Sequence, residues 1–557
     1  MRPGGRRAGR WATGVAAPLH ALRRTVHDPP VLRLQLAWSL SVIGSWTVTV
    51  ALAVVAYDAG GTPAVSLAVL ARTLPGLLVG PLLGALISRT STSACLIAAA
   101  AVAAVCSAGA ALARSSLVAV VALVTLVAVA TMMFRAAQSA VLPELVDDPT
   151  ELTAANMLSS AVEAAGLFAG PALAGVLLAV AGPAAAFATA AGFFAAAALL
   201  LVRRPVHRDR GARRSAPQSG GLRALLALPA ARLLLLLVVA QTVLSGALAT
   251  LYPALAVDVL DSGSSAVGLL TAAFGLGGLL VSVGLVALAG SRRLGLLTAG
   301  ALVLWTVPLL AVPLLPHLAA VVLLLAVAGG GNALFDVTCV TLLQRAVPAA
   351  QLGRAFAWLE TAAVLGLGAG AAAAAPLEAA VGPAAALALL AALLLLGAVA
   401  VVRPLRQLDR SLTAPVRQVA VLRALEPFAV LPTLEVERLA LQLVHVTVLP
   451  GEAVVRQGER GTTYFVVEQG ELEVDVDGSV VTHLHAGDSF GEIALLREGV
   501  RTATVTAQTP ADLWSLDGKV FLAALQAGSG RPRAAFDEVA SAHLRRAAPR
   551  CPVDHDV

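Results

Sequence analysis

Long apolar stretches separated by short polar segments dominate the chain up to residue 403. Each stretch is long enough to cross about 30 Å of hydrocarbon as an α-helix. In chain order they run over 34–57, 64–87, 94–113, 116–138, 153–180 and 183–202, and then over 232–257, 265–289, 295–315, 318–342, 353–376 and 379–402. The pattern predicts twelve membrane-spanning helices in two sets of six.

Beyond residue 420 the pattern changes to short runs that alternate between apolar and polar residues, as in β-strands with one buried face. The predicted strands are 464–467, 471–476, 480–484 and 503–507, and the glycines at the predicted turns are Gly451, Gly458, Gly470, Gly478 and Gly487. Helices are expected around 419–425 and 436–444 before the strands, and at 534–547 after them. The predicted fold is an all-α membrane bundle of twelve transmembrane helices, followed by a small jelly-roll-like β-barrel with flanking helices.

These patterns divide the chain into seven segments. They are a basic N-terminus (1–33), the first six-helix repeat (34–203), a basic loop (204–231), the second six-helix repeat (232–403), a linker (404–420), the β-barrel domain (421–547) and a tail (548–557).

Composition supports a membrane location. Of the 557 residues, 58% are hydrophobic and 13% are charged, with a mean hydropathy of +0.85, which is far from that of soluble domains. The 39 basic residues include one lysine, so the arginine excess reflects base composition as well as function. The four cysteines have no metal-ligand or disulfide-framework spacing, and the N-terminus lacks the short apolar core of a cleaved signal peptide.

Arginines predict the orientation in the membrane. They precede the first predicted span and then recur at alternate span ends, as at Arg89, Arg135 and Arg345, while Asp58 and Asp258 lie at the opposite ends. By the positive-inside rule, both termini, the basic loop and the barrel domain are expected in the cytoplasm, with the bundle in the plasma (inner) membrane.

The two sets of helices repeat one another. Residues 134–205 align on 335–404 with a shift of about 200, which matches Gly170 with Gly370 and the run AGPAAAF at 181 with VGPAAAL at 381. With GPLLGALISR at 80–89 and the run at 141–178, this repeat resembles the major facilitator superfamily, closest to its multidrug and siderophore exporter-like branches. The family's loop pattern G-x-L-A-D-R is only partly kept. Gly84 and Arg89 match it, whereas Ser88 stands at the acidic position.

Charged residues in or near the spans are candidates for the translocation path, because charge is costly in lipid. They are Arg72, Glu163, Asp336 and Glu360, together with Arg135. Arg135 and Asp336 are repeat equivalents near cytoplasmic ends, where pairing with loop groups or snorkelling is the favoured interpretation. Arg72 and Glu163 lie deeper, and Glu163 is the better proton carrier because a carboxyl in apolar surroundings titrates closer to neutral pH. The frequent helix glycines fit packing and gating equally well.

One cassette in the barrel region carries recognisable ligand chemistry. In FGEIALLREGVRTATV at 490–505, Gly491 permits close approach of the backbone, and amide groups at the start of the turn that follows can bind phosphate. Arg501, nine residues after Glu492, can hold a phosphate oxygen in bidentate fashion, and Glu492 can accept from a ribose hydroxyl. The cassette therefore predicts a site for a cyclic phosphodiester.

The cassette and its turn glycines resemble the cyclic nucleotide-binding domain family, whose pattern is F-G-E-x-A-L followed by R-[TSA]-A, over about residues 421–547. The binding residues that the resemblance implies are Phe490, Gly491, Glu492, Ile493, Ala494, Arg501, Thr502 and Ala503. The expected ligand is cAMP or cGMP, and Thr502 does not decide between them.

The leading functional prediction is a secondary transporter, an exporter of a small molecule, regulated by a cytoplasmic cyclic nucleotide. The alternative is a transport-inactive, membrane-anchored nucleotide receptor. No Walker motif, nucleophile elbow or metal-ligand cluster appears, so we expect no catalytic residues, no metal and no cofactor besides the regulatory nucleotide. No DNA-binding helix-turn-helix follows the barrel, so the expected partners are the lipid bilayer, the nucleotide and the transported solute, without nucleic acid.

Overall fold

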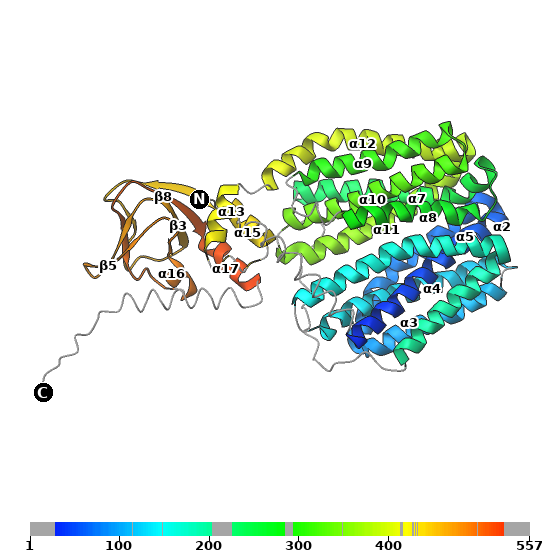
Figure 1. Cartoon of the computed structure of the whole chain (residues 1–557), viewed down its shortest axis with the longest axis horizontal. Helices are drawn as coiled ribbons and strands as arrows, with labels where there is room; N and C mark the ends of the chain where they lie inside the picture. The colour runs from blue at the N-terminus through cyan, green and yellow to red at the C-terminus, as the bar shows by residue number, and fades with distance from the viewer. Residues whose placement is uncertain are drawn as a thin grey trace, which may run out of the picture. The chain divides into compact units, whose positions relative to one another are not determined.

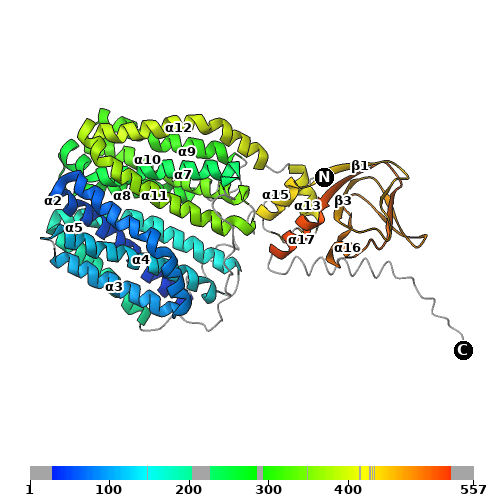
Figure 2. The ribbon, with the colours of Figure 1, turned by 180° about the vertical axis from the view of Figure 1, so that it is seen from behind.

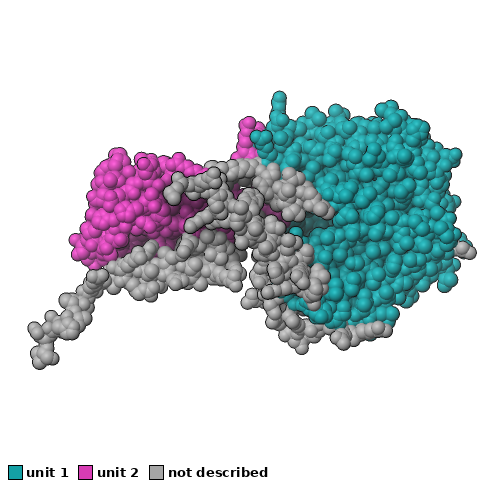
Figure 3. Space-filling model, viewed as in Figure 1, with its two compact units in different colours: residues 1–343, 350–406 teal, residues 344–349, 407–557 magenta. Residues whose placement is uncertain are grey.

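The computed structural model divides the chain into two compact units, one of residues 1–343 and 350–406 and the other of residues 344–349 and 407–557 (Figure 3). It describes residues 28–527 except 114, 147–148, 203–225, 285–292, 348, 413–415, 426–427, 429–430, 432 and 498. Most of the N-terminus, most of the basic loop 204–231, the helix predicted at 534–547 and the tail therefore lie outside the described residues.

Helices build the described part of the first unit and run side by side along one direction, as both views show (Figures 1 and 2). They are α2 (Pro29–Arg89), α3 (Thr92–Leu112), α4 (Leu117–Leu145), α5 (Pro149–Val202), α7 (Pro229–Ala254) with the π-helical turn η1 (Leu255–Val259), α8 (Ala266–Gly284), α9 (Leu294–Ala311) with the 3₁₀ turn η3 (Val312–Leu314), α10 (Leu318–Ala346), α11 (Ala349–Val381) and α12 (Pro383–Leu412).

Nine helices within the described residues are long and apolar enough to cross a membrane, and Ala266–Ser282 is a shorter apolar helix. Two of the nine contain a break at a glycine, α2 at Gly61 (φ 63°) and α5 at Gly182 (φ 77°). Both breaks fall between spans that the sequence predicts as separate. The apolar helical region is thus confirmed, and the count of twelve spans stays a prediction.

The internal repeat has a physical counterpart in glycine packing. A Cβ added to Gly170 on α5 would lie 2.5 Å from the Cβ of Trp46 on α2. A Cβ added to Gly370 on α11 would lie 1.8 Å from the carbonyl oxygen of Val243 on α7. Because the two glycines are 200 positions apart, the two halves use the same device to bring corresponding helices together.

A hydrogen bond joins the two halves of the first unit. The hydroxyl of Tyr57 on α2 donates to the carboxylate of Asp258 in η1. The two residues belong to different repeats, so this bond holds one end of the first half against the second.

The second unit contains two four-stranded antiparallel sheets and short helices. The helices are α13 (Val416–Ala424), α15 (Thr433–Leu441), α16 (Glu492–Leu496) and α17 (Gly518–Ala527), and the strands are β1 (Val444–Val448), β2 (Ala453–Val455), β3 (Thr463–Gln469), β4 (Leu472–Val476), β5 (Ser479–Leu484), β6 (Ser489–Phe490), β7 (Thr504–Ala507) and β8 (Ala511–Asp517). The strand orders are β1-β8-β3-β6 and β2-β7-β4-β5, and one buried apolar cluster takes side chains from both sheets.

The four predicted strands correspond to β3, β4, β5 and β7 and are confirmed. The five glycines placed at turns all have positive φ, between 81° and 101°, a backbone conformation that favours glycine. The helix expected at 436–444 ends earlier, at Leu441, because Val444, Val446 and Val448 alternate in strand β1. α12 continues to Leu412, so residues 404–412 of the predicted linker are helical.

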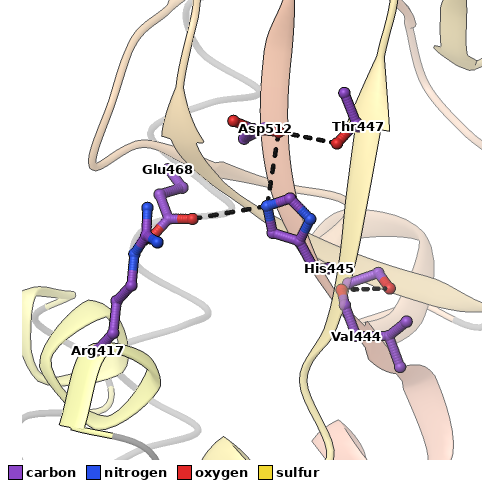
Figure 4. Close-up of polar contacts among 7 residues, drawn as sticks. Arg417, Val444, His445, Thr447, Glu468 and Asp512 are labelled. Atoms are coloured by element: carbon purple, nitrogen blue, oxygen red, sulfur yellow. Dashed lines mark hydrogen bonds and ion pairs between the residues drawn. The ribbon is translucent and has the colours of Figure 1, made fainter.

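A polar cluster fixes α13 to the sheet (Figure 4). Arg417 on α13 forms an ion pair of 2.5 Å with Glu468 on β3, whose side chain is 9% exposed. His445 on β1 lies 3.8 Å from Glu468 and 3.5 Å from Asp512 on β8, and its ring packs edge-on against Trp514. Arg417 thus supplies a counter-charge to the buried Glu468 carboxylate, and His445 reaches the same carboxylate from β1, across β8.

The second unit also includes the segment 344–349, which joins α10 to α11 in the sequence. The guanidinium of Arg438 on α15 donates to the carbonyl oxygens of Gln344 and Val347, the latter at 2.9 Å. An ion pair of 3.6 Å joins Arg345 to Glu437 on the same helix. Helix α15 therefore holds this segment by its backbone as well as by charge.

Candidate functional site

The predicted binding cassette lies at the junction of β6 and α16 in the second unit. Phe490 ends β6 and stacks on Phe465 of β3, with 5.1 Å between ring centroids. Gly491 follows in the left-handed conformation (φ 99°) and caps α16, whose first residue, Glu492, is 2% exposed. The glycine makes the sharp turn that places a carboxylate inside the domain directly after a strand.

Arg501 is the cation of this site and is 6% exposed. Its guanidinium donates to the carbonyl oxygens of Gly491 at 3.1 Å and Thr463 at 2.6 Å, and lies 6.0 Å from the centroid of the Phe465 ring. Burial lowers the pKa of Arg501, and the nearby carboxylates of Glu492 and Glu459 act in the opposite direction. An arginine nevertheless stays charged, so the site holds a fixed positive charge beside Glu492.

Two glycines make room for the Arg501 guanidinium, because they carry no Cβ. A Cβ on Gly491 would lie 2.6 Å from Nη1 of Arg501 and 2.8 Å from the carbonyl oxygen of Thr463. A Cβ on Gly461 would lie 2.5 Å from the Cβ of Ala494 and 3.0 Å from Nε of Arg501. Only glycine fits at either position without displacing the arginine.

The remaining cassette residues lie around this centre. Ile493 is half-buried and Ala494 is buried on α16, Thr502 is exposed, and Ala503 is half-buried just before β7. The structure therefore brings Phe490, Gly491, Glu492 and Ala494 together with Arg501, as the motif predicts. Thr502 is exposed although it directly follows the buried Arg501 in the sequence.

Sequence reasoning missed Gly461 and Thr463. Both precede or begin β3, about 40 positions before Arg501, and they shape its surroundings by a close approach and by a backbone carbonyl. A carbonyl leaves no signature in the side-chain sequence. Gly461 left a signal, since it is a glycine three residues before the predicted strand 464–467.

A second candidate site is a cavity of about 450 Å³ in the first unit. It is lined by Trp38, Ser41, Val42, Ser45, Trp46, Arg72, Thr131, Met132, Arg135, Ser160, Glu163, Ala164 and Leu167. These residues come from α2, α4 and α5, in the middle of the predicted first repeat. The volume is that of a pocket for a small organic molecule.

Two of the four transport-path candidates line this cavity and two do not. Arg72 and Glu163 line it, and Glu163 forms an ion pair of 3.1 Å with Arg135. Arg135 thus pairs with a carboxylate of the cavity rather than with a loop group, and its snorkelling, the other part of the favoured interpretation, stays a prediction. Asp336 accepts a hydrogen bond of 3.2 Å from Asn332 on its own helix, and Glu360 interacts electrostatically with both Glu163 and Asp336.

Two family models match the chain. The model of the Major Facilitator Superfamily covers residues 36–325, just over half of the 557 residues. The model of the cyclic nucleotide-binding domain covers residues 445–527, which include the whole cassette.

Individual relatives are similar to short parts of the chain. The chain is 49% identical over 86 residues to an uncharacterized protein of Mycobacterium tuberculosis (strain CDC 1551 / Oshkosh), a match covering 15% of this chain and 17% of that protein. Over 98 residues it is 41% identical to a cGMP-dependent protein kinase of Eimeria tenella, covering 17% of this chain and 10% of the kinase.

Two solved structures are also similar. The regulatory domain of Toxoplasma gondii PKA with cAMP is 31% identical, with a TM-score of 0.19, over 19% of this chain and 43% of that one. A regulatory subunit of a cAMP-independent protein kinase A from Trypanosoma brucei is 22% identical, with a TM-score of 0.20, over 23% and 44%. Each of these matches spans less than half of the relative's length.

The helical unit, its apolar spans and the extent of the family match agree with one another. The chain is a multi-pass membrane protein that belongs to the Major Facilitator Superfamily and carries a C-terminal cyclic nucleotide-binding domain.

Proposed function

We propose that the chain is a secondary transporter that exports a small molecule and that a cyclic mononucleotide, cAMP or cGMP, sets its activity. The observation that carries the proposal is the buried pair of Glu492 and Arg501 in a domain fused to a transporter bundle. Arg501 also donates to two backbone carbonyls, and what supports a ligand is its charge beside the Glu492 carboxylate in a cyclic nucleotide-binding domain.

In this proposal Arg501 pairs with the cyclic phosphate and Glu492 accepts from the ribose hydroxyl. The guanidinium has five N–H donors, and backbone carbonyls take up two of its bonds in the structure, so donors remain for a phosphate oxygen. The name of the Eimeria kinase favours cGMP as one candidate, and the exposed Thr502 is compatible with either nucleotide.

Both families consist of transporters or ligand-binding domains rather than enzymes, so the energy for transport would come from a gradient. We propose that protons are the coupling ion and that Glu163 carries them, because it is a cavity carboxylate whose charge Arg135 compensates at 3.1 Å. The plasma (inner) membrane, with both termini cytoplasmic, is the location that the arginine pattern supports.

The nucleotide part is tested by calorimetry on the full chain in lipid nanodiscs with cAMP and cGMP. Loss of a buried charge-assisted contact costs about 2–5 kcal/mol, so Arg501→Ala should weaken binding at least tenfold. Arg497→Ala, which removes an exposed arginine just beyond α16, should change affinity less than twofold. Equal binding by Arg501→Ala and wild type would refute the assignment.

The transport part is tested by pH-driven efflux of a panel of labelled compounds from everted vesicles, with and without nucleotide. Glu163→Gln should abolish the pH dependence of efflux, whereas Glu151→Gln, on the same helix but not among the cavity residues, should preserve it. Full pH-driven efflux by Glu163→Gln would eliminate Glu163 as the proton carrier. Nucleotide binding without movement of any compound would favour the receptor function.

A further inference from the structure

The cavity of the first unit holds more positive than negative charge. Arg72 and Arg135 are its cations, Glu163 is its carboxylate, and Glu163 is engaged by Arg135 at 3.1 Å. Arg72 has no ion-pair or hydrogen-bond partner among the residues that the structure describes. Within the described residues, one guanidinium of the cavity is therefore left without a counter-charge.

An arginine within a membrane-spanning helix is expensive, and such residues are normally paired or serve a function. Arg72 lies on α2 between the break at Gly61 and the end of the helix at Arg89, and lines a cavity large enough for an organic molecule. A ligand that brings a negative charge would supply the missing counter-charge. Filling the cavity would then offset part of the cost of holding this half-buried cation in the membrane.

The walls of the cavity indicate what accompanies that negative charge. Trp38 and Trp46 contribute aromatic surface, and Val42, Met132 and Leu167 contribute aliphatic surface. Trp38 is 5% exposed, and its Nε1–H has no acceptor within the described residues. An apolar or aromatic body with an acidic group at one end matches both the surface and the charge.

We propose that this cavity binds an organic anion, a carboxylate, sulfonate or phosphate ester on an aromatic or apolar body, with the acidic group on Arg72. This substrate class rests on the proposed transport function but is tested by binding alone. If the chain binds the anion but transports nothing, the transport function is refuted and the site stands. If the chain transports compounds but does not bind the anion, the site is refuted.

The test measures equilibrium binding to the full chain in nanodiscs of zwitterionic lipid, with empty nanodiscs as the blank. The probes are naphthalene-2-carboxylate, the neutral naphthalene-2-carboxamide and the cationic 2-naphthylmethylammonium, which share one ring system. We expect the carboxylate to bind at least tenfold more tightly than the other two. Equal affinities, a preference for the cation, or no binding of the carboxylate would overturn the proposal.

Variants connect the preference to Arg72. Arg72→Gln should reduce carboxylate affinity at least tenfold and leave the carboxamide unchanged, Arg72→Lys should keep the anion preference, and Arg232→Gln, at an exposed arginine of α7, should bind like wild type. An unchanged carboxylate affinity in Arg72→Gln overturns the assignment to Arg72. Should that variant not fold, the wild-type order of the three probes decides the proposal.

A lipid headgroup offers the same phosphate chemistry, so the measurement is repeated with phosphatidylglycerol in the nanodiscs. Unchanged carboxylate affinity supports a free organic anion. Competition by the anionic lipid would assign Arg72 to a headgroup and overturn the proposal.

Discussion

Arg501 has two roles in the nucleotide-binding unit. Two backbone carbonyls from different parts of the chain hold its guanidinium, and the same group supplies the positive charge of the candidate phosphate site. Gly491 makes both possible, because its left-handed turn leads the chain from β6 into α16 while leaving room for Nη1.

Gly491→Ala should therefore weaken nucleotide binding at least tenfold. The new Cβ would meet Nη1 of Arg501 at 2.6 Å and the Thr463 carbonyl oxygen at 2.8 Å, and a φ of 99° adds strain of about 1–3 kcal/mol. Gly487→Ala is the matched control, because its φ is 98° but its Cβ meets nothing within 4 Å. Calorimetry on both variants separates backbone strain from steric displacement, and equal losses in the two would show that the space around Arg501 is not decisive.

Helices of the first unit approach one another through glycines rather than through interlocking large side chains. Gly170 brings α5 onto α2, Gly370 brings α11 onto α7, and a Cβ on Gly268 of α8 would lie 2.4 Å from the backbone of Gly175 on α5. Inside a bilayer the hydrophobic effect no longer drives helices together, so such close backbone contacts contribute much of the packing energy. Of these elements, α2 and α5 also form walls of the cavity, so its shape depends on the contact at Gly170.

Gly370→Ala should destabilise the first unit. The added Cβ would lie 1.8 Å from the Val243 carbonyl oxygen, and overpacking of this kind costs about 1–3 kcal/mol. Gly300→Ala on α9, where a Cβ meets nothing within 4 Å, should be neutral or slightly stabilising because alanine favours helix. The measurement is the apparent melting temperature in detergent. A melting temperature of Gly370→Ala equal to that of wild type would contradict the packing interpretation.

The whole chain joins a transporter bundle to a ligand-binding domain, and a regulatory signal needs a physical path from one to the other. The segment 344–349 belongs to the second unit yet continues directly into α10 and α11 of the bundle. Arg438 of α15 donates to two backbone carbonyls of this segment, and Arg345 of the segment pairs with Glu437 of α15. A ligand changes the balance of conformations only by its different affinity for them. If nucleotide binding changes the conformation of α15, these contacts with the segment would change with it.

Arg438→Ala should uncouple nucleotide from transport without changing nucleotide affinity. Its loss leaves the Gln344 and Val347 carbonyls without this donor, so α15 holds the segment only through the Arg345–Glu437 ion pair. We expect the nucleotide-dependent change in efflux to fall at least twofold, while binding measured by calorimetry stays within twofold of wild type. Arg456→Ala, at an exposed arginine of the same unit, is the control. An unaltered nucleotide response in Arg438→Ala would exclude this path.

Local features of the sequence determined much of this molecule. The lengths of the apolar runs predicted the helical membrane region, and the breaks at Gly61 and Gly182 fall where the pattern separates adjacent spans. Strand alternation and turn glycines predicted half of the strands, and the nine-residue step from Glu492 to Arg501 predicted the cassette. These succeed because hydropathy, left-handed φ and motif spacing depend on neighbouring residues alone.

Short strands and long-range partners were settled by packing. β2 and β6 have three and two residues, too few to show a period, and the first residue of β1, Val444, falls within the helix predicted at 436–444. Arg501 reaches the Thr463 carbonyl across 38 positions and Arg135 reaches Glu163 across 28. Arg72 lines the same cavity as Arg135 and has no hydrogen-bond or ion-pair partner among the described residues. No local pattern specifies such pairs, because which charges meet depends on how whole helices and sheets pack, and only their folding together creates the cavity and the space around Arg501.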